Sequence, residues 1–333
     1  MKNKKPRQVC YTTSESNCRE GITLSKFHND YTTSILTFEN FITFIFTLVD
    51  DLYQQCAPDC VRFRRNIKSA ILSDSEIITI AICGELLGID SESAWLKFVR
   101  RNYSHLFPKM CDRTRFNRTR RNLLQTINLI FTKLSSYFTE NLNEWVIVDS
   151  FPLEVCKFGR VKFCKSFRYE GATYGRNPSK KQTYFGYKAH VKTTTSGFIL
   201  NYEVTPANVD DRVALPNIID ESDRVIFADK GYVSKELEKS LKEQGQMLLA
   251  LKRKNAKDNF PKELRQIIFK IRRRIETTFS QLTCQFNIER VLAKSFYGLI
   301  TRLMGKFLAY NICQYINKIN YKINISCIKN LIF

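Results

Sequence analysis

Three acidic residues occupy positions from which carboxylates could act together. Asp149 ends the β-branched run WVIVD, and Asp229 ends the similar run VIFAD. A charge at the end of a buried strand is costly unless a metal ion, an ionic partner or solvent compensates it. If the two strands are neighbours, the two aspartates converge. Glu276 lies at the border of the apolar stripe of a predicted helix, so it can point at the same sheet when that helix packs there.

Carboxylates that converge on one point repel each other, and oxygen-ligated divalent cations such as Mg²⁺ or Mn²⁺ are the usual remedy. Two such ions ~4 Å apart activate the attacking oxygen and stabilise the leaving oxygen in phosphoryl transfer on nucleic acids. Each residue also has a simpler interpretation. An aspartate after a strand often caps a helix or forms a turn, and Glu276 could pair with Arg272 or Arg273 on its own helix.

The composition favours a folded protein that binds a polyanion. The chain of 333 residues has 53 basic and 32 acidic residues, a net charge of +21, and 44% hydrophobic residues, so a wholly disordered chain is excluded. A surplus of this size attracts nucleic acid or an acidic membrane surface. A membrane partner is disfavoured because the best apolar run, residues 38–49, is short and contains Glu39 and Asn40. The N-terminus lacks the apolar core of a secretion signal, which predicts a cytoplasmic protein.

The spacing of apolar residues divides the chain into four parts. Residues 1–34 are polar and lack periodicity, which predicts a flexible leader. Residues 35–143 have helical spacing, and Ser73 and Glu76 form a capping-box pattern in front of one helix. From residue 144 to residue 320, strands are followed by helices, which predicts an α/β fold with a mixed sheet. Residues 321–333 remain as a C-terminal tail.

The helical part carries a candidate DNA-binding surface. A basic helix is expected after Pro108, and it follows a shorter helix that begins near Ser91, an order typical of helix-turn-helix proteins. Phosphate contact would explain the crowding of its arginines, and a solvated basic face without a ligand is the alternative. The arginines are Arg113, Arg115, Arg118, Arg120 and Arg121.

A second basic group lies in or near a strand of a predicted hairpin. DNA contact and a solvated hairpin edge are both open interpretations of it. The group consists of Lys180, Lys181, Lys188 and His190.

Five blocks of the sequence together resemble the DDE-type transposases of insertion sequences, and they are most similar to the insertion sequence nine-eighty-two family. The blocks are VDSFPLEVC, FGYKAHV, TPANVDDR, FADKGYVSKEL and RRRIETTFSQL, and the resemblance runs in consistent order from about Leu72 to Tyr315. It implies an RNase-H-like catalytic domain, a mixed sheet flanked by helices, behind an all-helical DNA-binding region.

The resemblance also implies a catalytic set. Asp149 in VDS and Asp229 in DKGY match the two aspartates of the family, and Glu276 in RRRIET matches the glutamate. These three residues would hold two Mg²⁺ or Mn²⁺ ions. Water would be the nucleophile in strand nicking, and the freed 3′ hydroxyl would be the nucleophile in strand joining. The competing carboxylates, which are expected in loops, are Asp210, Asp211 and Asp223.

The partners implied by the resemblance are the terminal inverted repeats of the protein's own element and a target DNA. The resemblance also implies that a homodimer binds them and that it is associated with the nucleoid. Arg272 would contact DNA or position the glutamate, and Arg273 would contact DNA. Related transposases have a tyrosine and a lysine on this helix, where the present chain has Phe269 and Thr283.

Two other functions stay open at this point. A nuclease with the same metal core would hydrolyse DNA without joining it, and a decayed copy would only bind DNA. The complete set of Asp149, Asp229 and Glu276 argues against the decayed copy.

Overall fold

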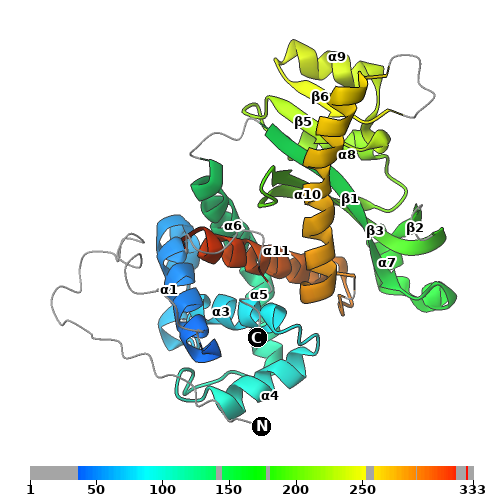
Figure 1. The fold of residues 1–333 in the computed structure, drawn as a ribbon. Helices are drawn as coiled ribbons and strands as arrows, with labels where there is room; N and C mark the ends of the chain where they lie inside the picture. The colour runs from blue at the N-terminus through cyan, green and yellow to red at the C-terminus, as the bar shows by residue number, and fades with distance from the viewer. Residues whose placement is uncertain are drawn as a thin grey trace, which may run out of the picture.

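The computed structural model describes residues 37–139, 145–177, 181–252, 259–289, 291–319 and 328. The predicted leader and nearly all of the predicted C-terminal tail lie outside these residues. A group of helices from the first part of the chain lies beside a sheet with its own helices (Figure 1). Within the described residues, none of the helices combines the length and the apolar character needed to cross a membrane.

The first part of the chain is helical, as its apolar spacing predicts. The capping box at the start of α3 is confirmed, because the Ser73 hydroxyl accepts from the Glu76 N–H at 3.1 Å and the Glu76 carboxylate accepts from the Ser73 N–H at 2.6 Å. Ser91 caps α4 in a similar way. The helices are α1 (Phe38–Cys56), α2 (Asp59–Arg62), α3 (Asp74–Leu86), α4 (Glu92–Asn102), α5 (Arg113–Asn122) and α6 (Leu124–Thr139).

The basic helix expected after Pro108 is two helices, since α5 ends at Asn122 and α6 begins at Leu124. The residue between them, Leu123, is buried. This break lets α5 pack on α3 and α4 while α6 packs on α1. Helical periodicity continues across the break, so the spacing of apolar residues could not reveal it.

The second part of the chain is built on a six-stranded mixed sheet. β3 pairs with β1 on one edge and with β2 and β4, end to end, on the other, and all three pairings are antiparallel. β1 pairs with β5, and β5 with β6, in parallel. The RNase-H-like mixed sheet expected from the resemblance is therefore confirmed. The strands are β1 (Trp145–Cys156), β2 (Thr173–Asn177), β3 (Gln182–Thr194), β4 (Ile199–Pro206), β5 (Val225–Ala228) and β6 (Met247–Ala250).

Helices cover both faces of the parallel half of this sheet. Val146 and Val148 of β1 pack toward α8 (Asp211–Ile218) and α9 (Lys235–Glu243), whereas Ile147 packs with Phe227 of β5 against α10 (Lys262–Phe286). Alternate residues of a strand point to opposite faces. Asp149 and Asp229 each lie two residues after an α10-facing residue, so their side chains also face α10.

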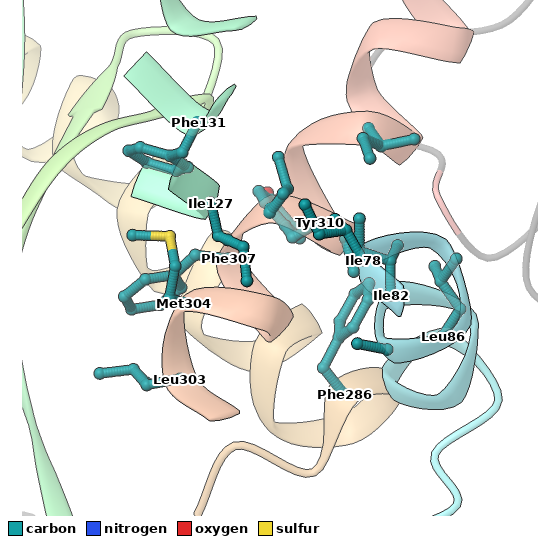
Figure 2. Close-up of a cluster of buried hydrophobic side chains, with 14 of the residues drawn as sticks. Ile78, Ile82, Leu86, Ile127, Phe131, Phe286, Leu303, Met304, Phe307 and Tyr310 are labelled. Carbon is teal, nitrogen blue, oxygen red and sulfur yellow. The ribbon is translucent and has the colours of Figure 1, made fainter. Parts of the chain in front are cut away.

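The last long helix, α11 (Phe296–Ile319), joins the helical part to the sheet part. Almost all of its residues are buried, and it packs on α3, α6 and α10. Its side chains Phe307 and Tyr310 share one cluster with Ile82 of α3, Phe131 of α6 and Phe286 of α10 (Figure 2). The two parts of the chain are thus connected through a common hydrophobic core.

Candidate active site

Two aspartates meet where the parallel pairing of β1 with β5 ends. Val148 of β1 stands opposite Ala228 of β5 in the parallel ladder, and the next residues along the chain are Asp149 and Asp229. The carboxylate of Asp149 accepts a hydrogen bond from the backbone N–H of Ser150 at 2.8 Å, which orients it. The predicted convergence of the two carboxylates is therefore present in the fold. The prediction that Asp149 ends its strand is wrong, because β1 continues to Cys156, whereas Asp229 does follow the last residue of β5.

Arg272 of α10 bridges these two carboxylates. Its Nη2 donates to Oδ2 of Asp149 at 3.0 Å, and its Nη1 donates to Oδ1 of Asp229 at 3.3 Å. The guanidinium is planar and carries a fixed set of donors, so it can hold two acceptors at once. The Arg272 side chain is only 6% exposed, which shows that its charge is used inside the protein. Sequence reasoning expected this residue to contact DNA or position Glu276.

The surroundings of Asp149 disfavour its charged form. Burial is the main cause, and together with the charges of Asp229 and Asp211 it raises the pKa of Asp149 to about 6, although Arg272 and the Ser150 N–H lower it. A carboxylate in a confined site binds a proton more readily when its surroundings disfavour charge. Neutralisation of this carboxylate, by a proton or by a bound cation, is therefore favoured.

Glu276 lies on α10 one helical turn after Arg272, so it belongs to the same side of the helix. Its side chain is exposed. In the described part of the chain, no three His, Cys, Asp or Glu side chains are close enough to form a metal cluster. The structure brings Asp149 and Asp229 together and leaves Glu276 outside their immediate contact.

The donor set nevertheless suits a divalent cation. Asp149 and Asp229 offer carboxylate oxygens, which Mg²⁺ and Mn²⁺ prefer. Arg272 already places a positive charge between them, so this position accepts a cation. The geometry can thus support phosphoryl-transfer chemistry if Glu276 approaches.

A third aspartate, Asp211, lies behind the site and was not selected from the sequence. It is the first residue of α8 and not part of a loop, and its Oδ1 accepts from Lys188 Nζ at 2.9 Å and from the Ser150 hydroxyl at 3.2 Å. Gly231, two residues after Asp229, also lies close to Asp211. A Cβ added at this glycine would be 2.6 Å from Asp211 Oδ2. Asp211 therefore connects both strand ends from the far face of the sheet. The sequence offered only the paired aspartates of TPANVDDR as a signal.

Lys188 and His190 lie in the same network and not on an exposed hairpin edge. His190 is fully buried, 2.9 Å from Thr205 Oγ1 and 3.6 Å from Asp211 Oδ1. Burial lowers the pKa of His190 to about 4, so the ring is neutral at pH 7. Lys181 is exposed, and Lys180 lies outside the described residues. Among the described residues of this predicted basic group, Lys181 alone is exposed at the surface.

The arginines of α5 have different surroundings. Arg113, Arg115 and Arg118 are exposed, and Arg121 is half-buried. Arg120 is buried, and it pairs with Glu92 of α4 at 3.1 Å. This arginine holds α5 to α4, whereas the exposed arginines face solvent.

A hollow of about 460 Å³ lies beside the exposed arginines. The segment between α2 and α3 forms its opposite wall. Four arginines line it, namely Arg64, Arg65, Arg115 and Arg118. Arg64 is held by Asp74 through two hydrogen bonds of 2.5 and 2.6 Å. The hollow therefore combines one fixed cation with three whose charge remains available.

Another basic hollow, of about 630 Å³, lies between α10 and the β3–β4 turn. Lys270, Arg273, Arg274 and Thr277 line it from successive turns of the helix, and Thr195 faces them from the β3–β4 turn. Among the described residues, no carboxylate pairs with these three cations. The spacing of three, four and seven residues makes them one stripe, adjacent to the stripe of Arg272 and Glu276. Phe269 is half exposed on the same helix.

Comparisons with known proteins identify the family of the chain. A family model described as a transposase DDE domain matches residues 141–312, a segment that includes Asp149, Asp229 and Glu276. No curated protein matches the chain. Among solved structures, a cryo-EM structure of the piggyBac transposase synaptic complex with hairpin DNA is similar, with a TM-score of 0.45 and 11% identity over 87% of this chain and 78% of that chain. Because the family match covers more than half of its length, the chain belongs to the transposases with a DDE domain.

Proposed function

We propose that this protein is a transposase of the insertion sequence nine-eighty-two family that cuts DNA at the ends of its own element and joins those ends to a target. The observation that carries the proposal is the meeting of Asp149 and Asp229 where the parallel pairing of β1 and β5 ends, beneath the helix that carries Glu276. The order of the five sequence blocks supports the narrower family.

Asp149 and Asp229 would hold divalent ions, Mg²⁺ or Mn²⁺, and Glu276 would complete the set. Two bound ions supply activation of the attacking oxygen and stabilisation of the leaving oxygen. The hydrogen bonds from Arg272 keep the two carboxylates together and partly neutralised in the free protein. Asp211 and the hydroxyl of Ser150 support the strand end that positions Asp149.

The basic hollow on α10 supports a path for DNA past this site. Lys270, Arg273 and Arg274 would hold phosphates on the helix that also carries Glu276. The exposed arginines of α5 and the arginine-lined hollow beside them would bind the terminal inverted repeats. Two DNA ends must be brought together for joining, so we propose a homodimer on DNA. Its place of action would be the nucleoid in the cytoplasm.

The test is incubation of the purified protein with labelled DNA that carries the ends of its element, in Mg²⁺ or Mn²⁺. Variants Asp149→Asn, Asp229→Asn and Glu276→Gln are expected to bind this DNA and to lose both nicking and joining, because each removes one carboxylate. Asp210→Asn is the matched control: Asp210 is exposed, pairs with Arg212, and should retain most activity. Equal loss from Asp210→Asn and Asp229→Asn would contradict the assignment of the second aspartate.

The products distinguish the alternatives. Nicked DNA without a joined product would favour a nuclease. DNA binding by the wild type without nicking in either ion would favour a decayed copy that only binds DNA. A joined product that requires all three acidic residues would support the transposase.

A further inference from the structure

A segment with unusual surface chemistry follows β1. Residues 157–177, named here the aromatic arm, comprise the 3₁₀ helix η3 (Phe158–Phe163), the short helix α7 (Lys165–Tyr169) and β2. Figure 1 shows α7 and β2 projecting from the end of the sheet, away from the first helices of the chain.

Four aromatic rings of the arm lie at its surface. Tyr169 is 85% exposed and Phe163 is 81% exposed, while Phe158 and Tyr174 are each more than half exposed and lie with their ring centroids 5.8 Å apart. Exposed rings of this size are costly in water, so a group of them marks a contact surface.

The arm has a packed core, so poor packing does not explain why the four rings are exposed. Phe167 is buried, and its ring packs against Tyr187 of β3 with the centroids 6.3 Å apart. The Tyr187 hydroxyl also donates to the backbone carbonyl of Glu170 at 3.0 Å. The Glu170 carboxylate accepts from the N–H of Phe296 at 2.8 Å, which ties the arm to the start of α11. The arm is thus a built platform whose outer rings remain uncovered.

Positive charge surrounds these rings. Six exposed cations stand on the arm against the single carboxylate of Glu170, and none of the six forms an ion pair with a described acidic residue. The cations are Lys157, Arg160, Lys162, Lys165, Arg168 and Arg176. Aromatic rings for stacking combined with cations for phosphates are the features of surfaces that bind unpaired nucleic-acid strands.

We propose that the aromatic arm binds unpaired DNA, with bases stacked on Phe163 and Tyr169 and phosphates held by the surrounding cations. Paired bases are stacked inside the duplex and leave an exposed ring little to contact, so duplex DNA would use the cations alone. A second copy of the chain fits less well, because a symmetric contact would place like charges against each other.

The location suits a strand that leaves the active site. The arm begins eight residues after Asp149 along β1. At about 3.3 Å per residue, this separation is roughly 25 Å. A DNA strand cut at the aspartates would reach the arm after several nucleotides. The inference rests on the proposed function for the identity of the nucleic acid as DNA.

The test is fluorescence anisotropy with a labelled single strand and with the duplex of the same sequence, in a chelator so that no cleavage occurs. The double variant Phe163→Ala/Tyr169→Ala should bind the single strand at least about thirty-fold more weakly and the duplex as the wild type does, since stacking contributes about 1–3 kcal/mol per base and two rings are lost. The matched control Phe163→Tyr/Tyr169→Phe keeps both rings and should retain binding. Circular dichroism checks that each variant folds.

A second variant separates charge from stacking. Lys162→Gln/Lys165→Gln should weaken binding to both forms of DNA and lower the salt dependence of the affinity, because fewer counterions are released. Equal weakening of both forms by loss of the rings, or no weakening, would overturn the inference. The inference would also be overturned if sedimentation showed a dimer for the wild type and a monomer for the ring variant, because the arm would then be a contact between two copies of the chain. If the wild type cuts and joins DNA while the ring variant binds unpaired DNA normally, the inference fails and the proposed function stands.

Discussion

Replacing Asp149 by asparagine should stabilise the metal-free protein at pH 7. The pKa of Asp149 is about 6 in the folded protein, against an ordinary value of 3.8. One pKa unit corresponds to about 1.4 kcal/mol, so the charged carboxylate lowers the free energy of unfolding by roughly 3 kcal/mol at pH 7. Asparagine has the size of the neutral acid and can still accept a hydrogen bond from Arg272. The expected gain in the free energy of unfolding is therefore up to roughly 3 kcal/mol.

The sign of the pH dependence follows from the raised pKa. Between pH 6 and pH 4 the folded state binds a proton at Asp149 more tightly than the unfolded state, so the wild type gains stability as the pH falls through this window. The advantage of Asp149→Asn should be full above about pH 6 and lost near pH 4. Urea denaturation of both proteins at several pH values, with a chelator present, measures this difference.

The matched control is Asp210→Asn, because the pKa of Asp210 is shifted in the opposite direction. The Arg212 side chain lowers the pKa of Asp210 to about 2, and the Asp210 carboxylate caps α8. Its replacement should leave the stability unchanged or lower it at pH 7. The reasoning is refuted if Asp149→Asn is less stable than the wild type at pH 7, or if its advantage is the same at every pH. Added Mg²⁺ should stabilise the wild type and Asp210→Asn but not Asp149→Asn, because only Asp149→Asn lacks a proposed ligand.

Other substitutions test the packing and the basic surface. In Gly186→Ala, the added Cβ would lie 2.1 Å from a backbone carbonyl oxygen of β1, so the melting temperature should fall, with a cost of about 1–3 kcal/mol or more. Glu85→Gln would leave the buried Arg302 and Lys306 without their carboxylate and should cost about 3–5 kcal/mol in urea denaturation. Arg118→Gln should weaken DNA binding with little change in melting temperature, whereas Arg120→Gln should lower the melting temperature because it breaks a buried ion pair; the reverse pattern would contradict the division of the α5 arginines.

The features that the sequence predicted depend on residues close together in the chain. The capping box of Ser73 and Glu76 spans a single turn, and short apolar runs precede Asp149 and Asp229 in their strands. Such patterns can be recognised without knowing what lies beside them. The assignment of Glu276 depended on a family resemblance, and it stays a prediction.

The features that the sequence did not reveal depend on contacts between distant segments. Arg272 joins Asp149 across more than one hundred residues, so no pattern within its own helix could show that it bridges the two aspartates. His190 and Lys188 alternate with apolar residues along β3, as side chains on a solvated edge would. Only the helix α8, which brings Asp211 against that face, makes the position a buried one.

The position of α11 in the fold also affects how the protein is made. Its side chains fill the core of α3 and α6, which leave the ribosome before any strand of the sheet. Domains usually fold as units in the order of synthesis. Here the first helices cannot complete their core until α11 has been synthesised, after the whole sheet. Until then Ile82 and Phe131 lack the α11 side chains that pack with them in the finished fold. A ribosome that stops early would release helices without their core, so a truncated product should be removed by proteases before it could occupy DNA.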